Sequence, residues 1–275
     1  MSISAPRSWL GDLDALLRGQ RTTLDSLRQG IIDVPLRSFV PLAVVLGASY
    51  GFFMGWYALS SHKAGAWQQV LAASVKLPML FLLTLFVTFP SLYVFNALVG
   101  CRLGFLAALR LLVAAIVVNL AVGASLGPIL GFFTLSTQSY PFMVILNVVL
   151  LGIGGSVGLA FLLRTLRRIE SAAVEEARFE AMLRVEAERE RAAKEGDNPT
   201  SAVLKAAGTV EIPAGAASGI FKVWVVIYAL VGAQMAWLLR PFIGHPNIEF
   251  AWFRPKEGNF FSSVVSHLGQ LLGFN

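Results

Sequence analysis

Long apolar runs recur along the chain, and each is close to the length that a helix needs to cross a membrane. About 20 consecutive apolar residues span the hydrocarbon core of a bilayer as an α-helix. Four such runs precede a charged segment and one follows it, so we expect five membrane spans. The expected spans are residues 39–60, 77–100, 103–126, 140–163 and 218–240. This pattern predicts an all-α fold, a polytopic membrane helix bundle.

The segment 164–195 interrupts the apolar pattern with eight basic and eight acidic residues, and it contains neither glycine nor proline. Glu180 with Arg184, and Glu188 with Arg191, stand four and three residues apart, where opposite charges stabilise a helix. We therefore predict one long charged helix between the fourth and fifth spans. At about 1.5 Å per residue it would project roughly 45–50 Å as a stalk or arm.

Two segments of different composition flank these elements. Residues 1–38 predict an amphipathic N-terminal segment, because apolar residues recur there at helical spacing: Trp9, Leu10, Leu13, Leu16 and Leu17. This helix either lies on the membrane surface and docks a partner or lies on its own bundle, and the second interpretation is favoured. Residues 196–217 are rich in glycine, alanine, serine and proline and predict a linker.

Glycines at four-residue spacing mark the faces on which the spans are expected to pack. Gly47, Gly51 and Gly55 share one face of the first span, and Gly154 and Gly158 lie in the fourth. Such faces allow two helix backbones to approach closely. Contacts within one chain are favoured, and contacts between copies are the alternative. A dinucleotide-binding loop is disfavoured for the fourth span, because no strand precedes its glycines.

Few polar or helix-breaking residues interrupt the spans. Pro90 predicts a kink in the second span, and we expect nearby hydroxyls to satisfy the carbonyls that it frees; they belong to Thr84, Thr88 and Ser91. Arg110 and Asn119 lie within the third span. Arg110 is either a functional intramembrane charge or a side chain that reaches the headgroups, and the second interpretation is favoured.

The connections between spans are short and carry few charges. Residues 61–76 and 127–139 are expected at the membrane interface, the second of them because Pro128 should interrupt the helix before it. Trp224 and Trp237 stand near the two ends of the fifth span. Tryptophan is enriched at membrane interfaces, so this pair predicts an aromatic belt.

Arginine residues cluster on one side of the predicted spans. Five precede the first span, Arg102 lies between the second and third, and three directly follow the fourth. Cytoplasmic loops carry an excess of arginine and lysine. We therefore expect the N-terminus and the charged helix inside and the C-terminus outside.

The exterior tail, residues 241–275, is dense in aromatic residues and prolines. Burial of each large aromatic is worth about 1.5–3 kcal/mol, which favours an ordered cap over the outer end of the bundle. Apolar residues at helical spacing from Phe260 to Leu272 predict a terminal amphipathic helix. The residues assigned to the cap are Arg240, Pro241, Phe242, Gly244, Arg254 and Asn259.

Two stretches carry a resemblance to known membrane proteins. The segment from Lys76-Leu-Pro to Phe95-Asn96-Ala-Leu, with the five-span pattern, resembles the Yip1-like group of small polytopic membrane proteins. The tail, from Arg240-Pro-Phe-Ile-Gly244 onward, is similar to uncharacterised bacterial multi-pass membrane proteins. These resemblances imply an integral protein of the bacterial cytoplasmic (inner) membrane. The long charged helix departs from the compact Yip1 pattern.

Composition narrows the classes of function. The chain is 56% hydrophobic with a mean hydropathy of +0.69, which is typical of a multi-pass membrane protein. Its net charge of +6 does not predict nucleic-acid binding, because the arginines lie beside the apolar runs. Cys101 is the only cysteine, so an internal disulfide and a cysteine-based metal site within one chain are excluded. We expect no cofactor and no bound metal.

No catalytic motif stands out, and we expect a non-enzymatic protein. The favoured function is a scaffold or anchor subunit of a membrane protein complex, whose partners are membrane lipid and either other subunits or further copies of the chain. The alternative is a transporter or channel subunit, in which a polar path would be lined by Pro90, Asn96, Arg110, Asn119, Asn147 and Gln234. Its solute would be neutral or anionic, because the spans contain no carboxylate.

Overall fold

The part of the chain that the structure describes forms seven α-helices and no strand. The structure is a computed structural model, which describes residues 9–20, 34–60, 65–98, 104–195, 216–244, 248–253 and 258–273. The helices are α1 (Trp9–Leu17), α3 (Leu36–Ser60), α4 (Ala66–Leu98), α5 (Phe105–Ser136), α6 (Tyr140–Glu195), α8 (Ala216–Leu239) and α9 (Phe260–Leu272). The expected all-α fold is confirmed for these residues. Most of the predicted linker, and Arg254 of the predicted cap, lie outside them.

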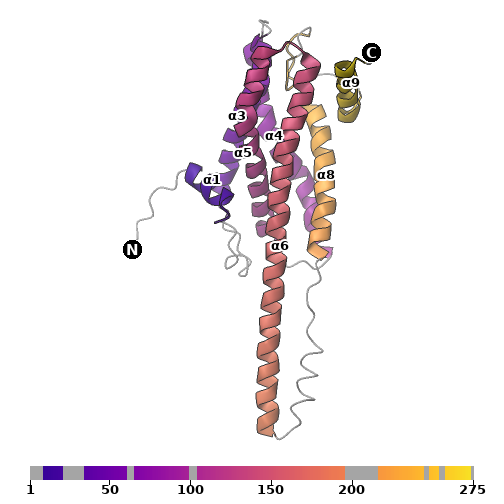
Figure 1. The fold of residues 1–275 in the computed structure, drawn as a ribbon. Coiled ribbons are helices and arrows are strands. Elements are labelled where there is room, and N and C mark those ends of the chain that lie inside the picture. Colours follow the sequence, from indigo (N-terminus) through magenta and orange to yellow (C-terminus); the bar gives the residue numbers. More distant parts are fainter. Residues whose placement is uncertain are drawn as a thin grey trace.

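Four of the described helices, α3 to α6, are long and apolar enough to cross a membrane. The helix α8 is also apolar but shorter over its fully described part, Val223–Leu239. Figure 1 shows α3, α4, α5, α6 and α8 side by side, with their axes roughly parallel. The described chain is therefore a helical bundle of the membrane type, as the apolar runs predict.

The two ends of the bundle differ. At one end, α3 and α5 finish, α4 and α6 begin, and α9 lies nearby; we call it the cap end. At the other end α6 continues alone beyond its neighbours, and we call it the arm end (Figure 1). Consecutive helices from α3 to α6 therefore run antiparallel, and α8 returns the chain from the arm end to the cap end.

A close contact joins α3 to α4 through glycine. A Cβ atom placed on Gly51 would lie 2.5 Å from the carbonyl oxygen of Ala73, and one on Gly55 would lie 2.6 Å from the Cα of Val70. Gly47 meets Pro78 in the same way, at 2.9 Å. The two backbones thus touch with no side chain between them, which is the geometry that small residues permit in membrane helices.

A second glycine contact joins α5 to α6. A Cβ atom on Gly154 would lie 2.7 Å from Asn119 Oδ1, and one on Gly158 would lie 2.9 Å from the carbonyl oxygen of Ala115. Both predicted glycine faces therefore pack within one chain. Tyr50 connects the two contacts, because its buried hydroxyl donates a hydrogen bond of 3.1 Å from α3 to Asn147 Oδ1 on α6.

Hydrogen bonds fasten α8 to α4. Trp224 Nε1 donates to the carbonyl oxygen of Thr88 over 3.1 Å, and the Tyr228 hydroxyl donates to that of Phe81 over 3.3 Å. The expected position of Trp224 in an aromatic belt is therefore wrong. Its ring is buried, because its N–H finds an acceptor on the neighbouring helix.

The helix α4 begins at Ala66, so the expected interfacial connection over 61–76 is wrong from that residue onward. The stretch from Ala66 to Lys76 contains neither glycine nor proline. Its small residues Ala72 and Ala73 are wholly buried in the contact with α3. Packing against the glycine face therefore extends α4 beyond the part that hydropathy identifies.

The helix α5 continues through Pro128 to Ser136, so the expected interruption there is also wrong. Pro128 is exposed, while Gly127 and Gly131 on either side lie against the ring of Phe53. Membrane helices tolerate proline where neighbouring helices hold the chain. Contact with α3 thus keeps the last turns of α5 helical.

Pro90 lies exposed within α4. A proline leaves the carbonyl four residues earlier without its helical donor, which here is that of Phe86. The hydroxyls of Thr84, Thr88 and Ser91 donate instead to Leu80, Thr84 and Thr88, respectively. The expectation that they satisfy the carbonyl freed by Pro90 is therefore wrong, and the kink stays a prediction.

The N-terminal helix α1 packs against α3. Leu16 is wholly buried and belongs to the hydrophobic core, while Trp9, Leu10 and Leu17 remain exposed. The favoured interpretation, a helix that lies on its own bundle, therefore holds for one face of α1. Leu13 packs partly against the core as well, and Trp9, Leu10 and Leu17 face outward.

Substitution of Gly51 by alanine tests the α3–α4 contact. The added methyl group would collide with the backbone of Ala73, and overpacking of this kind costs about 1–3 kcal/mol. We expect a clearly lower melting temperature for the Gly51→Ala variant in detergent, followed by circular dichroism. Gly152→Ala is the matched control, because a Cβ there meets nothing within 4 Å. Equal melting temperatures of the two variants would contradict the contact.

Candidate functional site

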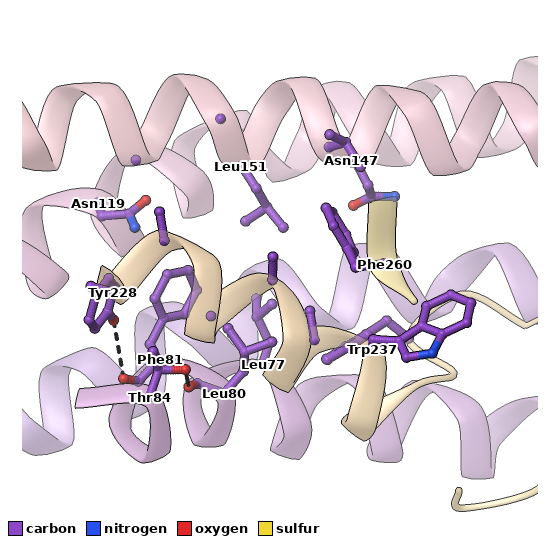
Figure 2. Close-up of a pocket in the computed structure, with 18 of the residues that line it drawn as sticks. Leu77, Leu80, Phe81, Thr84, Asn119, Asn147, Leu151, Tyr228, Trp237 and Phe260 are labelled. Atoms are coloured by element: carbon purple, nitrogen blue, oxygen red, sulfur yellow. Dashed lines mark hydrogen bonds between the residues drawn. The ribbon is translucent and has the colours of Figure 1, made fainter. Parts of the chain in front are cut away.

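An apolar cavity of about 790 Å³ lies between α4, α5, α6 and α8 and reaches α9 at the cap end. Most of its lining is aliphatic or aromatic, and Figure 2 shows Leu77, Leu80 and Leu151 in its middle. The polar side chains in its lining include those of Thr84, Asn119, Asn147, Tyr228, Trp237 and Arg240. The volume is within the range of about 300–1,000 Å³ that is usual for ligand pockets.

The cavity is partly open to its surroundings and its lining is mainly apolar, so it is filled from the medium around the bundle rather than left empty. Water needs two to four polar partners per molecule, and the aliphatic middle of the cavity offers few. An apolar occupant therefore suits the cavity best.

The polar groups of the cavity differ in how they are satisfied. Thr84 and Tyr228 donate to carbonyls of α4, and Asn147 accepts from Tyr50 and donates to the carbonyl of Met143 over 3.0 Å. Within the described part of the chain, Asn119 Oδ1 and Trp237 Nε1 are buried without a hydrogen-bond partner. A buried polar atom without a partner costs about 1–3 kcal/mol and calls for an explanation.

The two unsatisfied atoms lie in different parts of the cavity. Figure 2 shows Asn119 near Tyr228 and Thr84, and Trp237 near Phe260 at the opposite end. Asn119 Oδ1 faces the backbone of Gly154, where weak Cα–H contacts are possible. Trp237 lies in the last turn of α8, and the guanidinium carbon of Arg240 lies 3.6 Å from the centroid of its ring.

Arg110 does not line the cavity. It is half-buried near the arm end, in the second turn of α5. The structure thus brings Asn119, Gly154 and Gly158 together beside the cavity and leaves Arg110 and Pro90 apart from them. The position of Arg110, close to a helix end, favours the interpretation that its side chain reaches toward the headgroups.

Two buried side chains of α4 hold the tail at the cap end. Gln69 Nε2 donates to the carbonyl oxygens of Pro241 and Phe242 over 3.1 and 2.9 Å. The ammonium of Lys76 donates to the carbonyl of Trp252 and lies 4.9 Å from the ring centroid of Phe253. Neither role is predictable from the sequence, because both residues precede the expected second span.

Small residues allow the tail to approach the bundle closely. A Cβ atom on Gly244 would lie 2.7 Å from the Cβ of Ala58 on α3. Pro241 and Ile243 are buried beside it, whereas Phe242 is half-buried. The part of the tail from Arg240 to Gly244 therefore lies against α3 and α4.

The expected burial of the tail aromatics is wrong for Trp252, Phe253 and Phe261, which are about half exposed or more. The Lys76 ammonium, which donates to the carbonyl of Trp252, lies 5.8 Å and 4.9 Å from the ring centroids of Trp252 and Phe253. These two rings therefore contact the bundle through Lys76, while more than half of each side chain remains exposed. Exposed aromatic rings at a bundle end suit a membrane interface.

The terminal amphipathic helix is present as α9. Asn259 caps it, because its side chain accepts from the amide of Ser262 over 2.8 Å while Ser262 Oγ accepts from the amide of Asn259. The helix packs against α6 and α8, and the rings of Tyr140 and His267 lie 5.6 Å apart. Phe260 in its first turn lines the end of the cavity (Figure 2).

The helix α6 runs without interruption from Tyr140 at the cap end to Glu195 beyond the arm end. Arg184 with Glu180, and Arg191 with Glu188, form exposed ion pairs of 3.9 and 3.7 Å. Three apolar side chains at i, i+3 and i+4 are nonetheless exposed on one face, namely Phe179 (63%), Met182 (69%) and Leu183 (51%). We call these three residues the arm patch.

No family model, curated protein or solved structure matches the chain. Among the described residues, no group of three or more histidine, cysteine, aspartate or glutamate side chains is placed to hold a metal ion.

Replacement of Gln69 by leucine tests how the tail is held. The change removes two hydrogen bonds and leaves the carbonyls of Pro241 and Phe242 without their donor, at a cost of about 1–3 kcal/mol each. We expect faster hydrogen exchange at the amides of residues 242–244, measured by mass spectrometry. Gln68→Leu is the control, since Gln68 is an exposed neighbour of the same size. Equal exchange in the two variants would refute the role of Gln69.

Proposed function

We propose that the chain is a non-enzymatic integral membrane protein that acts as a scaffold or anchor subunit of a membrane protein complex. In this proposal α8 is the fifth span, the N-terminus and the arm of α6 are cytoplasmic, and the tail with α9 is exterior. The membrane is the bacterial cytoplasmic membrane, in line with the resemblance to bacterial multi-pass proteins and to the Yip1-like group.

The observation that carries the proposal is the continuity of α6. One helix joins the apolar part of the bundle to the projecting arm, so a partner bound to the arm would be fixed to the membrane without a flexible joint. The arm patch supplies an apolar surface among charges, which is the pattern of a helix that packs on another protein helix. The partner is another subunit or a second copy of the chain.

Two single cysteines in a Cys101→Ser background test the topology. The proposal places Glu188→Cys inside and Ala251→Cys outside, because an odd number of spans separates the N-terminus from the tail. An impermeant maleimide added to intact cells should label position 251 and should label position 188 only after permeabilisation. Labelling of both positions from the same side would contradict five spans.

A photoreactive residue at Met182 tests the scaffold role. We expect ultraviolet light to yield one discrete adduct in native membranes, whose mass identifies either another subunit or a second copy of this chain. The control is the same probe at Arg184, which points to another side of α6 at nearly the same depth. Absence of an adduct, or equal adducts from both positions, would argue against docking through the arm patch.

A transporter or channel subunit for a neutral or anionic solute is the second candidate. The cavity favours it, since Asn119 brings an amide among apolar residues within a membrane-type bundle. Uptake of labelled solutes into proteoliposomes separates the two candidates. The scaffold proposal expects no uptake above that of protein-free vesicles.

A further inference from the structure

We propose that the cavity between α4, α5, α6 and α8 holds one acyl chain of a membrane phospholipid. In this assignment the chain lies along the helix axes, and the ester and phosphate oxygens of the lipid lie at the cap end beside Trp237. The inference is independent of the scaffold role, because it concerns the bundle and leaves the arm of α6 uninvolved.

The cavity is long enough to hold one acyl chain. Its lining on α8 extends from Trp224 to Trp237, which at about 1.5 Å per residue is about 20 Å. Its lining on α6 extends from Tyr140 to Leu162, or about 33 Å. The hydrocarbon core of a bilayer is about 30 Å thick and contains two leaflets, so a chain of one leaflet covers about 15 Å of it. A single chain that enters at the cap end therefore fits along the helix axes within the cavity.

The polar groups at the cap end of the cavity fit the oxygens of a lipid. Trp237 Nε1 is buried without a partner among the described residues, and the guanidinium of Arg240 stacks on the same ring. Indole and guanidinium groups donate hydrogen bonds and accept none. The ligand atoms beside them must therefore be acceptors. Ester and phosphate oxygens are acceptors, and the negative charge of the phosphate suits Arg240.

The rest of the cavity fits hydrocarbon. Leu77, Leu80 and Leu151 lie between the Asn119 region and Trp237 (Figure 2). Asn119 Oδ1 is directed to the backbone of Gly154, so the middle of the cavity remains apolar. Four helices of the bundle are of membrane-spanning length, so phospholipid surrounds the cavity at high concentration. A lipid chain is therefore the apolar molecule most available to fill the cavity.

The test counts the lipids bound to the full-length chain. Protein is reconstituted into vesicles of phosphatidylethanolamine and phosphatidylglycerol, extracted in mild detergent and weighed by native mass spectrometry. Gly155→Leu and Gly152→Leu should block the cavity, because both positions line it and a Cβ at either meets nothing within 4 Å. Val149→Leu is the control, since Val149 is exposed on the same helix and does not line the cavity.

We expect one phospholipid on the unchanged chain and on Val149→Leu, and at least about a fivefold lower occupancy in a blocking variant that keeps the original melting temperature. Two blocking variants are used so that one misfolded protein does not decide the result. Trp237→Phe keeps an aromatic ring, although a smaller one, and removes the donor, so retention of lipid should fall about two- to tenfold, as expected for one hydrogen bond. Trp67→Phe, at an exposed tryptophan outside the cavity, should change nothing.

Three results would overturn the proposal. Lipid occupancy in both folded blocking variants equal to that of Val149→Leu would place the lipid elsewhere. Detergent in place of phospholipid would mean an adventitious additive only. Release of the bound mass by inorganic phosphate would mean that the site recognises a free anion rather than a lipid with its chain in the cavity.

Discussion

The close approach of α3 and α4 is the contact on which the rest of the described chain depends. Gly51 and Gly55 lie directly against the backbone of α4, with no side chain between them. This contact holds α4 along α3 as far as the cap end. There α4 carries Gln69 and Lys76, whose side chains bind carbonyls of the tail. A helix that began at residue 77 would leave the tail without either donor.

The same helix determines where the cavity opens. Trp224 and Tyr228 bind α8 to carbonyls of α4, while Gly154 and Gly158 allow α6 to pack closely against α5. The two pairs of helices are thus fixed by different contacts, and space remains between them. Gly152 and Gly155 face that space without a neighbour within 4 Å, so α6 does not fill it.

The helices and the packing glycines can be predicted from the sequence, because they depend on local pattern. The apolar runs identified the helices, and four-residue spacing identified Gly51 and Gly154 as packing residues. Local pattern does not predict the structure where a contact with a residue distant in the sequence overrides a local preference. Pro128 remains helical because α3 supports α5 around it, and Trp224 is buried because α4 offers a carbonyl. The cavity depends on how four helices are placed together, which no spacing along one helix encodes.

A disulfide cross-link tests whether the tail is attached to the α3–α4 pair. In a Cys101→Ser background, cysteines at Ala58 and Gly244 should form an intramolecular disulfide under mild oxidation, because their Cβ atoms would lie 2.7 Å apart and a shift of the tail by about 1 Å brings them to the usual separation of about 3.5–4.5 Å. The pair at Val45 and Gly244 is the control, since Val45 lies 13 residues earlier along α3, about 20 Å away. We expect a reducible mobility shift for the first pair alone. Equal yields from the two pairs would contradict it.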